Sequence, residues 1–142
     1  MQITRQADYA VRAILYLAQL GVNQKASTSQ IAEDQEIPLS FLAKIIAQLS
    51  VAGLLQTMRG ARGGVLLARS PEEITLLDVV EAIDGPILLN ECVSGEYECP
   101  MHECPMRTVW SAAQADLVER LRATNFAQFL RPNLIQPAAI KP

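Results

Sequence analysis

Three cysteines, Cys92, Cys99 and Cys104, lie close together in a chain of 142 residues that contains no other cysteine. Three thiols cannot pair off as disulfides within one chain, so a disulfide framework is a poor explanation for them. A glycine and two prolines interrupt the same stretch, which predicts a shaped loop rather than a helix or a strand. Thiolates that converge from different directions on such a loop are typical ligands of a soft metal ion or an iron–sulfur cluster.

The surroundings of these cysteines favour a metal or cluster site over a purely structural role. Buried structural cysteines behave as small apolar residues, whereas the neighbours of these three include the acidic residues Glu91, Glu96, Glu98 and Glu103. His102 also lies in the loop, so one alternative is a structural zinc ion held by the three thiols and this imidazole. Two further alternatives are an electron-transfer or redox protein, and a regulator that uses thiol chemistry or a protein partner without any metal.

The distribution of charge divides the chain into two parts. Residues 1–70 hold seven Lys and Arg against four Asp and Glu, a net charge of +3, whereas residues 71–142 hold five against eleven, a net charge of −6. A basic first part and an acidic second part fit a DNA-binding head joined to a regulatory body. Half of the residues are apolar and few are aromatic, which favours a helical fold.

Several classes of protein are excluded by the same composition. No apolar run is long enough to span a membrane, and the start of the chain has no signal-peptide pattern, so we expect a cytoplasmic protein with no membrane partner. Thiols stay reduced in that compartment and are available for metal. Nothing in the chain resembles a substrate site, so we expect neither enzymatic activity nor a small-molecule substrate.

The first part of the chain predicts a helix-turn-helix. The spacing of apolar residues indicates a helix that begins at Thr4 as its cap and ends near residue 20. Ser27 and Gln30 fit a capping box for a short second helix that ends near residue 35.

A third helix is expected to open at Ser40 and to end near residue 52. The side opposite its apolar stripe carries the residues that we expect to contact DNA: Ser40, Phe41, Lys44 and Gln48. The second helix of such a pair can enter the major groove.

A basic hairpin follows the helix pair. Residues 54–58 and 65–68 read as two strands, and the intervening residues contain three glycines, which permit a tight turn. Arg59 and Arg62 lie in this turn without an acidic residue nearby, and arginine suits the narrow, negatively charged minor groove. The order of helix, turn, helix and basic hairpin predicts a winged helix.

Two more helices are predicted beyond the wing. Thr75 and Asp78 mark the start of a fourth helix that ends near residue 83. A long helix over about residues 107–123 carries an apolar stripe that includes Trp110 and Leu117. Such a stripe needs a partner, either its own domain or, as we favour, a second copy of the chain.

The predicted fold class is therefore mainly α, a winged helix-turn-helix with a two-stranded wing and a long C-terminal dimerisation helix. We expect residues 1–85 to form the DNA-binding domain and residues 86–106 to form a cysteine loop that binds a cluster. Residues 107–131 are expected to hold the dimerisation helix and a short terminal helix, and residues 132–142 to form a flexible tail.

Four stretches resemble one known family. These are residues 1–10, residues 37–42, the wing residues 59–64, and the three cysteines before a long helix. Together they resemble the Rrf2 family of bacterial winged-helix regulators, over nearly the whole chain up to about residue 130. The resemblance implies a homodimer that binds a double-stranded DNA operator and holds an iron–sulfur cluster, as in the branches that regulate iron–sulfur-cluster biogenesis and sense nitric oxide.

The resemblance also assigns residue roles. It makes Cys92, Cys99 and Cys104 the cluster ligands, directs the third helix to the major groove and directs Arg59 to the minor groove. Members of the family place five residues between successive cysteines, whereas this chain has six between the first pair and four between the second.

The fourth ligand of the cluster is open. Arg107 stands where the biogenesis branch supplies a histidine, so we favour a [4Fe–4S] over a [2Fe–2S] cluster. Asp8 matches the position from which the nitric-oxide-sensing branch takes an acidic ligand across the dimer, and His102 is the alternative. Asp8 can also be a helix-start acid, or a partner for Arg5 or Arg12.

Overall fold

The computed structural model describes residues 2–130, so the tail predicted over residues 132–142 lies outside the described residues. The helices are α1 (Arg5–Leu20), α2 (Thr28–Gln35), α3 (Leu39–Val51), α4 (Leu76–Asp84) and α5 (Pro105–Arg122). The strands are β1 (Leu55–Met58) and β2 (Gly64–Leu67), and the short 3₁₀ turns are η1 (Pro71–Glu73), η2 (Glu91–Val93) and η3 (Phe126–Phe129). The predicted mainly helical winged-helix fold is confirmed.

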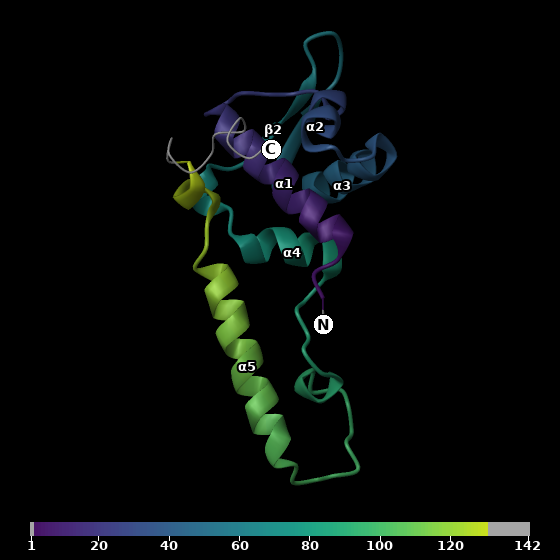
Figure 1. Ribbon diagram of the computed structural model, residues 1–142, viewed down its shortest axis with the longest axis vertical. Helices are drawn as coiled ribbons and strands as arrows, with labels where there is room; N and C mark the ends of the chain where they lie inside the picture. Colours follow the sequence, from purple (N-terminus) through teal and green to yellow (C-terminus); the bar gives the residue numbers. More distant parts are fainter. Residues whose placement is uncertain (1, 131–142) are drawn as a thin grey trace, which may run out of the picture.

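The elements form a head and a long arm (Figure 1). The first three helices, the two-stranded wing and α4 make up the head, and α5 runs away from it to the cysteine loop at the opposite end of the molecule. The core of the head is apolar and comes mainly from α1 and α3, with side chains that include Ile14, Leu17, Leu42, Ile45 and Leu49, all at most 1% exposed. Within residues 2–130, no helix combines the length and the apolar character needed to cross a membrane.

Local capping explains where several helices begin. The Thr4 hydroxyl accepts a hydrogen bond from the Ala7 amide, as expected for the start of α1. Thr75 and Asp78 form the full capping box predicted for α4.

Two predicted details of helix starts are wrong. Ser27 caps α2, but Gln30 does not complete a capping box, because its side-chain amide donates to Asp34 at 2.9 Å instead. The cap residue of α3 is Pro38, so Ser40 lies inside the first turn rather than opening the helix. Pro38 has φ −57° and ψ 128°, so its backbone turns into the helix without a side-chain cap hydrogen bond, and its ring fixes the φ angle.

A polar contact ties α1 to α2 in the head. The Tyr16 hydroxyl donates to the Asp34 carboxylate at 2.6 Å. This hydrogen bond, together with partial burial and the negative charge of Asp34, raises the pKa of Tyr16 to about 12. The phenol therefore remains a donor at physiological pH and holds the second helix against the first.

The two ends of α5 have different surroundings. Leu117, Val118 and Leu121, near its C-terminal end, pack on a small cluster made by Leu77 and Val80 of α4 together with Ile87. The N-terminal part has no such cover, and Met106, Val109 and Trp110 are 51%, 55% and 42% exposed. The predicted apolar stripe is therefore shared between the chain's own head and an open surface.

The chain returns to the head after α5. The amide of Leu76 donates to the Thr124 carbonyl at 2.8 Å, and the amide of Phe126 donates to the Ile74 carbonyl at 3.2 Å. Phe126 is 3% exposed and belongs to the core of the head. These contacts anchor the base of the arm.

The wing is a short antiparallel hairpin in which Met58 pairs with Gly64. Gly63 lies where its backbone passes very close to the other side of the turn, and a Cβ atom there would stand 2.3 Å from the Met58 carbonyl oxygen and 2.8 Å from that of Gly60. Backbone atoms on both sides leave no room for such an atom. Only glycine fits this position without opening the hairpin.

Gly63→Ala is therefore expected to destabilise the protein by about 1–3 kcal/mol, because the added methyl group must displace backbone rather than side chain. Urea unfolding of the purified protein measures the effect. Ala61→Ser, an exposed substitution in the same turn, is the control and should leave the midpoint unchanged. Equal midpoints for Gly63→Ala and the wild type would contradict the close approach.

Candidate functional site

The cysteine loop joins α4 to α5 at the end of the arm farthest from the wing (Figure 1). It leaves α4 at Gly85 and re-enters a helix at Pro105, directly after Cys104. The long helix was expected to begin near residue 107, but proline is well suited to the first helical position because its fixed backbone angle matches the helix. Cys104 therefore stands at the N-terminus of α5.

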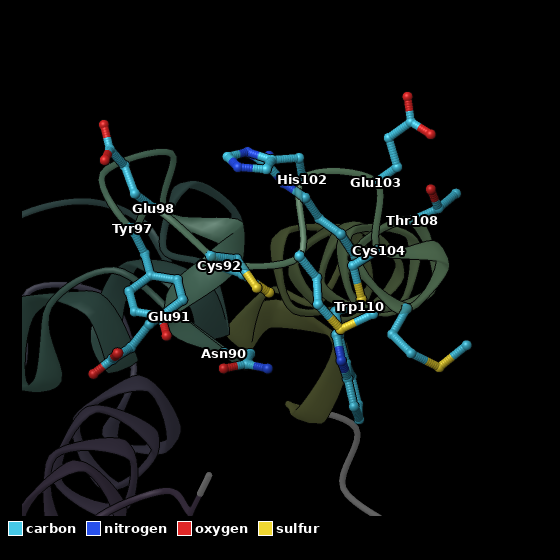
Figure 2. Close-up of a pocket in the computed structure, with 14 residues that line it drawn as sticks. Asn90, Glu91, Cys92, Tyr97, Glu98, His102, Glu103, Cys104, Thr108 and Trp110 are labelled. Carbon is cyan, nitrogen blue, oxygen red and sulfur yellow. The ribbon is translucent and has the colours of Figure 1, made fainter.

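All three cysteines line one pocket of about 650 Å³. Each is a free thiol and half-buried. The remaining lining residues include Tyr97, Met101, Met106 and Trp110, together with polar and charged residues that include Glu98, His102, Glu103 and Arg107. In Figure 2 the Cys92 and Cys104 thiols point into the loop, whereas the Glu98 and Glu103 carboxylates point away from it.

The chemistry of these donors fits a soft metal or an iron–sulfur cluster. Sulfur ligands, partial burial and an apolar wall are the surroundings that such a group needs. Within residues 2–130, however, no three Cys, His, Asp or Glu side chains are close enough together to hold a metal ion as they stand. A metal ion or cluster held by all three cysteines would therefore require the loop to draw its thiols together, which would couple ligation to local ordering.

The two candidates for a fourth ligand lie in different places. His102 is exposed and lines the pocket with the cysteines. Asp8 lies in the first turn of α1, in the head, and is not among the residues that line the pocket of its own chain. Its carboxylate faces the Arg12 guanidinium at 3.6 Å, one of the partners expected from the sequence.

The outgoing limb of the loop is attached to the arm. The Gln114 side chain on α5 accepts a hydrogen bond from the Leu89 amide at 2.9 Å. Ile87, two residues earlier, is buried against α4 and α5. Gln114 was not predicted from the sequence, because a single glutamine on a helix carries no signal of a contact 25 residues away.

The proposed DNA-reading side of α3 is open to solvent. Ser40, Phe41, Lys44 and Gln48 are all exposed, while the apolar stripe of the same helix is buried in the head. The Phe41 side chain is 49% exposed on this side of the helix. The helix thus presents one cation, two polar side chains and one ring on a single face.

The wing places further cations beside this helix. Arg59 and Arg62 are exposed in the turn of the hairpin, and no ion pair engages either within the described residues. Lys25, which the sequence analysis missed, donates from its ammonium group to the Arg62 carbonyl. This contact follows from the pairing of Ala26 with Val65 of β2, a tertiary contact that leaves no local pattern.

Comparison with known sequences identifies the family. The chain matches the family described as "Rrf2: Iron-dependent Transcriptional regulator" over residues 3–132. It is 40% identical to the protein aau3 of Rhizobium meliloti over 102 residues, which are 71% of this chain and 66% of that protein. It is 33% identical to the protein rrf2 of Nitratidesulfovibrio vulgaris over 138 residues, 96% of this chain and 92% of that one.

A third relative is the HTH-type transcriptional regulator NsrR of Shouchella clausii, 36% identical over 96 residues, which are 68% of this chain and 64% of that protein. The chain thus spans just under two thirds of the length of NsrR and of aau3 in these matches.

Solved structures share the fold. The T. potens IscR structure has a TM-score of 0.76 at 26% identity, with 100% of this chain and 93% of that chain covered. The structure of CymR, the global cysteine regulator of B. subtilis, has a TM-score of 0.78 at 25% identity, with 92% and 96% covered. The match to the family extends from the first helix to the end of the arm, and the chain belongs to the Rrf2 family of transcriptional regulators, which are DNA-binding proteins rather than enzymes.

Proposed function

We propose that this transcriptional regulator is a cytoplasmic homodimer that senses redox state, iron or nitric oxide through an iron–sulfur cluster held by Cys92, Cys99 and Cys104. The observation that carries the proposal is that three half-buried thiols line one pocket at the tip of the long arm. The iron-dependent character of the family supports it. A [4Fe–4S] cluster is favoured, because Arg107 replaces the histidine that a three-cysteine-one-histidine [2Fe–2S] site needs.

The DNA-binding surface is formed by α3 and the wing. The exposed polar face of α3 suits the major groove, and Arg59 and Arg62 suit the adjacent minor groove. Lys25 adds a cation beside the turn of the wing, where a phosphate contact would position the head. The target is a double-stranded operator with one half-site for each head of the dimer.

The dimer is formed by the open part of α5. Met106, Val109 and Trp110 form an exposed apolar surface that adjoins the cysteine pocket, since Met106 and Trp110 also line it, and Met101 of the same pocket is 62% exposed. A second copy that covers this surface would also restrict access to the thiols. Ligation that orders the loop then changes the packing of the two arms and with it the spacing of the two heads.

Anaerobic purification of the full chain tests this function. The expected protein is coloured, contains iron and acid-labile sulfide, and binds an operator fragment with an affinity that changes when the cluster is removed. A colourless protein with one zinc ion per chain would contradict the proposed sensor and indicate a structural zinc site instead. DNA binding that is identical with and without the cluster would refute cluster-dependent regulation.

The fourth ligand is tested by Asp8→Ala. If Asp8 coordinates the cluster of the partner copy, the variant keeps a cluster on three cysteines but changes its visible spectrum and its response to nitric oxide. His102→Ala is the matched comparison and should leave both unchanged. The opposite result, with the spectral change in His102→Ala alone, would transfer the fourth position to His102.

Loss of the ion pair between Asp8 and Arg12 is controlled separately. Arg12→Gln removes the same pair without removing the carboxylate. A spectrum that changes equally in Asp8→Ala and Arg12→Gln would assign the effect to the surroundings of Arg12, which is partly buried and also donates to the Gln35 carbonyl, and not to ligation by Asp8.

A further inference from the structure

Gln114 occupies an unusual position on α5. Every residue from Pro105 to Asp116 is exposed except Gln114, which is half-buried. Its amide oxygen accepts a hydrogen bond from the Leu89 amide at 2.9 Å. The apolar Val109 and Trp110 remain open to solvent on the same part of the helix, so a polar side chain makes the contact between this stretch of the arm and the outgoing limb of the loop.

This hydrogen bond stands close in sequence to one thiol and on the same helix as another. Cys92 follows Leu89 by three residues and lies in η2, a turn closed by hydrogen bonds from the Val93 amide to the Asn90 carbonyl and from the Ser94 amide to the Glu91 carbonyl, both 3.0 Å. Cys104 is the cap residue of α5, ten residues before Gln114. A short hydrogen-bonded turn therefore connects Gln114 to Cys92, and about 15 Å of continuous helix connects it to Cys104.

Cys99 is held less firmly. It lies in the stretch between η2 and α5, where the structure assigns neither helix nor strand. Cys92 and Cys104 thus belong to hydrogen-bonded elements and Cys99 does not, and no three donors within residues 2–130 already converge.

We propose that Gln114 is a positioning residue, which holds Cys92 opposite Cys104 so that the loop needs only to bring in Cys99. This inference rests on the proposed function as far as the natural ligand is an iron–sulfur cluster. The arrangement of the thiols is a property of the apo protein and can be measured with a soft metal ion alone. Groups that orient metal ligands typically contribute 10- to 100-fold to metal affinity.

Three variants of the full-length protein separate the hydrogen bond from the volume of the side chain. Gln114→Met keeps the length of the side chain and removes the acceptor. Gln114→Glu keeps an acceptor for the Leu89 amide. Gln128→Met is the control, because Gln128 also makes a side-chain hydrogen bond, to the Ala123 carbonyl at 3.2 Å, but lies in η3 at the base of the arm.

The first measurement is anaerobic titration of the reduced apo protein with Cd²⁺, followed by thiolate-to-metal absorbance. We expect about a tenfold or greater loss of Cd²⁺ affinity in Gln114→Met, near-wild-type affinity in Gln114→Glu, and no change in Gln128→Met. Hydrogen exchange of the Leu89 amide should accelerate in Gln114→Met alone. Wild-type Cd²⁺ affinity in Gln114→Met would overturn the proposal, even if exchange at Leu89 accelerates.

The second measurement separates this inference from the proposed function. Iron–sulfur reconstitution is carried out on the same proteins, and the rate of cluster loss to a chelator is recorded. Failure of the wild type to take up a cluster, with the Cd²⁺ effect of Gln114→Met intact, refutes the cluster and supports the positioning role. Equal rates of cluster loss in the wild type and Gln114→Met, with equal Cd²⁺ affinities, refute the positioning role and leave the cluster in place.

Discussion

Replacement of Cys99 by alanine is expected to abolish stable cluster binding while the protein remains folded and dimeric. A cluster that loses one of three thiolates has too few protein ligands to resist exchange with solvent and chelators. The dimer persists because its proposed surface, around Val109 and Trp110, contains none of the cysteines. Iron and sulfide content after anaerobic purification, together with the mass in solution, measure both parts of the prediction.

Cys92→Ala and Cys104→Ala should have the same effect as Cys99→Ala. Met101→Ala is the matched control, because Met101 lines the same pocket, is 62% exposed and carries a sulfur atom that ligates iron–sulfur clusters poorly. Its iron and sulfide content should equal that of the wild type. A Cys99→Ala protein that keeps its full complement of both elements would remove Cys99 from the ligand set.

Arg59→Ala is expected to weaken operator binding by about 1–3 kcal/mol per half-site, the usual cost of a lost side-chain readout contact. The side chain is exposed in the turn of the wing, so the fold and any cluster should be unaffected. Fluorescence anisotropy with a labelled operator measures the loss. Arg120→Ala is the control, because Arg120 is an exposed arginine in the last turn of α5, outside α3 and the wing, and the variant should bind the operator as the wild type does.

Lys44→Ala distinguishes a phosphate contact from a base contact. If Lys44 contacts a phosphate, its loss should weaken binding to specific and non-specific DNA alike. It should also lower the slope of log K against log salt by about one. The loss of affinity in Arg59→Ala should instead depend on the operator sequence at the minor groove that Arg59 contacts. Unchanged affinity of Arg59→Ala for every operator would remove the wing from DNA recognition.

The parts of the fold that depend on neighbouring residues were predictable from the sequence. Thr4, Ser27 and Thr75 cap helices as expected, because a cap bonds an amide two or three residues away. The wing was found in the expected place because its glycines and arginines are contiguous. Ser40 was misassigned because Pro38 fixes the backbone before it, an effect that competes with side-chain capping at the same point.

The parts that depend on tertiary contacts were not predictable. The apolar residues of α5 form one stripe in sequence, yet Leu117 and Leu121 pack on α4 and Trp110 does not. The spacing of residues on a helix says which side is apolar but not what lies opposite. Lys25 and Gln114 acquire their contacts only when β2 and the outgoing limb of the loop are in place.

The same distinction applies to the candidate site. The types and spacing of the cysteines predicted one shared location, and the structure places all three around one pocket. Whether Asp8 of one copy reaches the loop of another depends on the arrangement of two chains and stays a prediction. His102 was expected as an alternative from its position in the loop, and it does line the pocket.

The length of α5 limits how the loop and the wing can influence each other. An 18-residue helix is about 27 Å long, whereas the electric field of a charge in physiological salt decays over about 8 Å. A gain or loss of charge at the thiols is therefore screened long before it reaches DNA. The base of α5 is anchored by Phe126, which is buried in the core of the head. A tilt of the helix by about 10° about this base moves its other end by about 5 Å over that length. The proposed regulation therefore requires mechanical communication between the two ends, for which the contacts of α5 with α4 are a direct route.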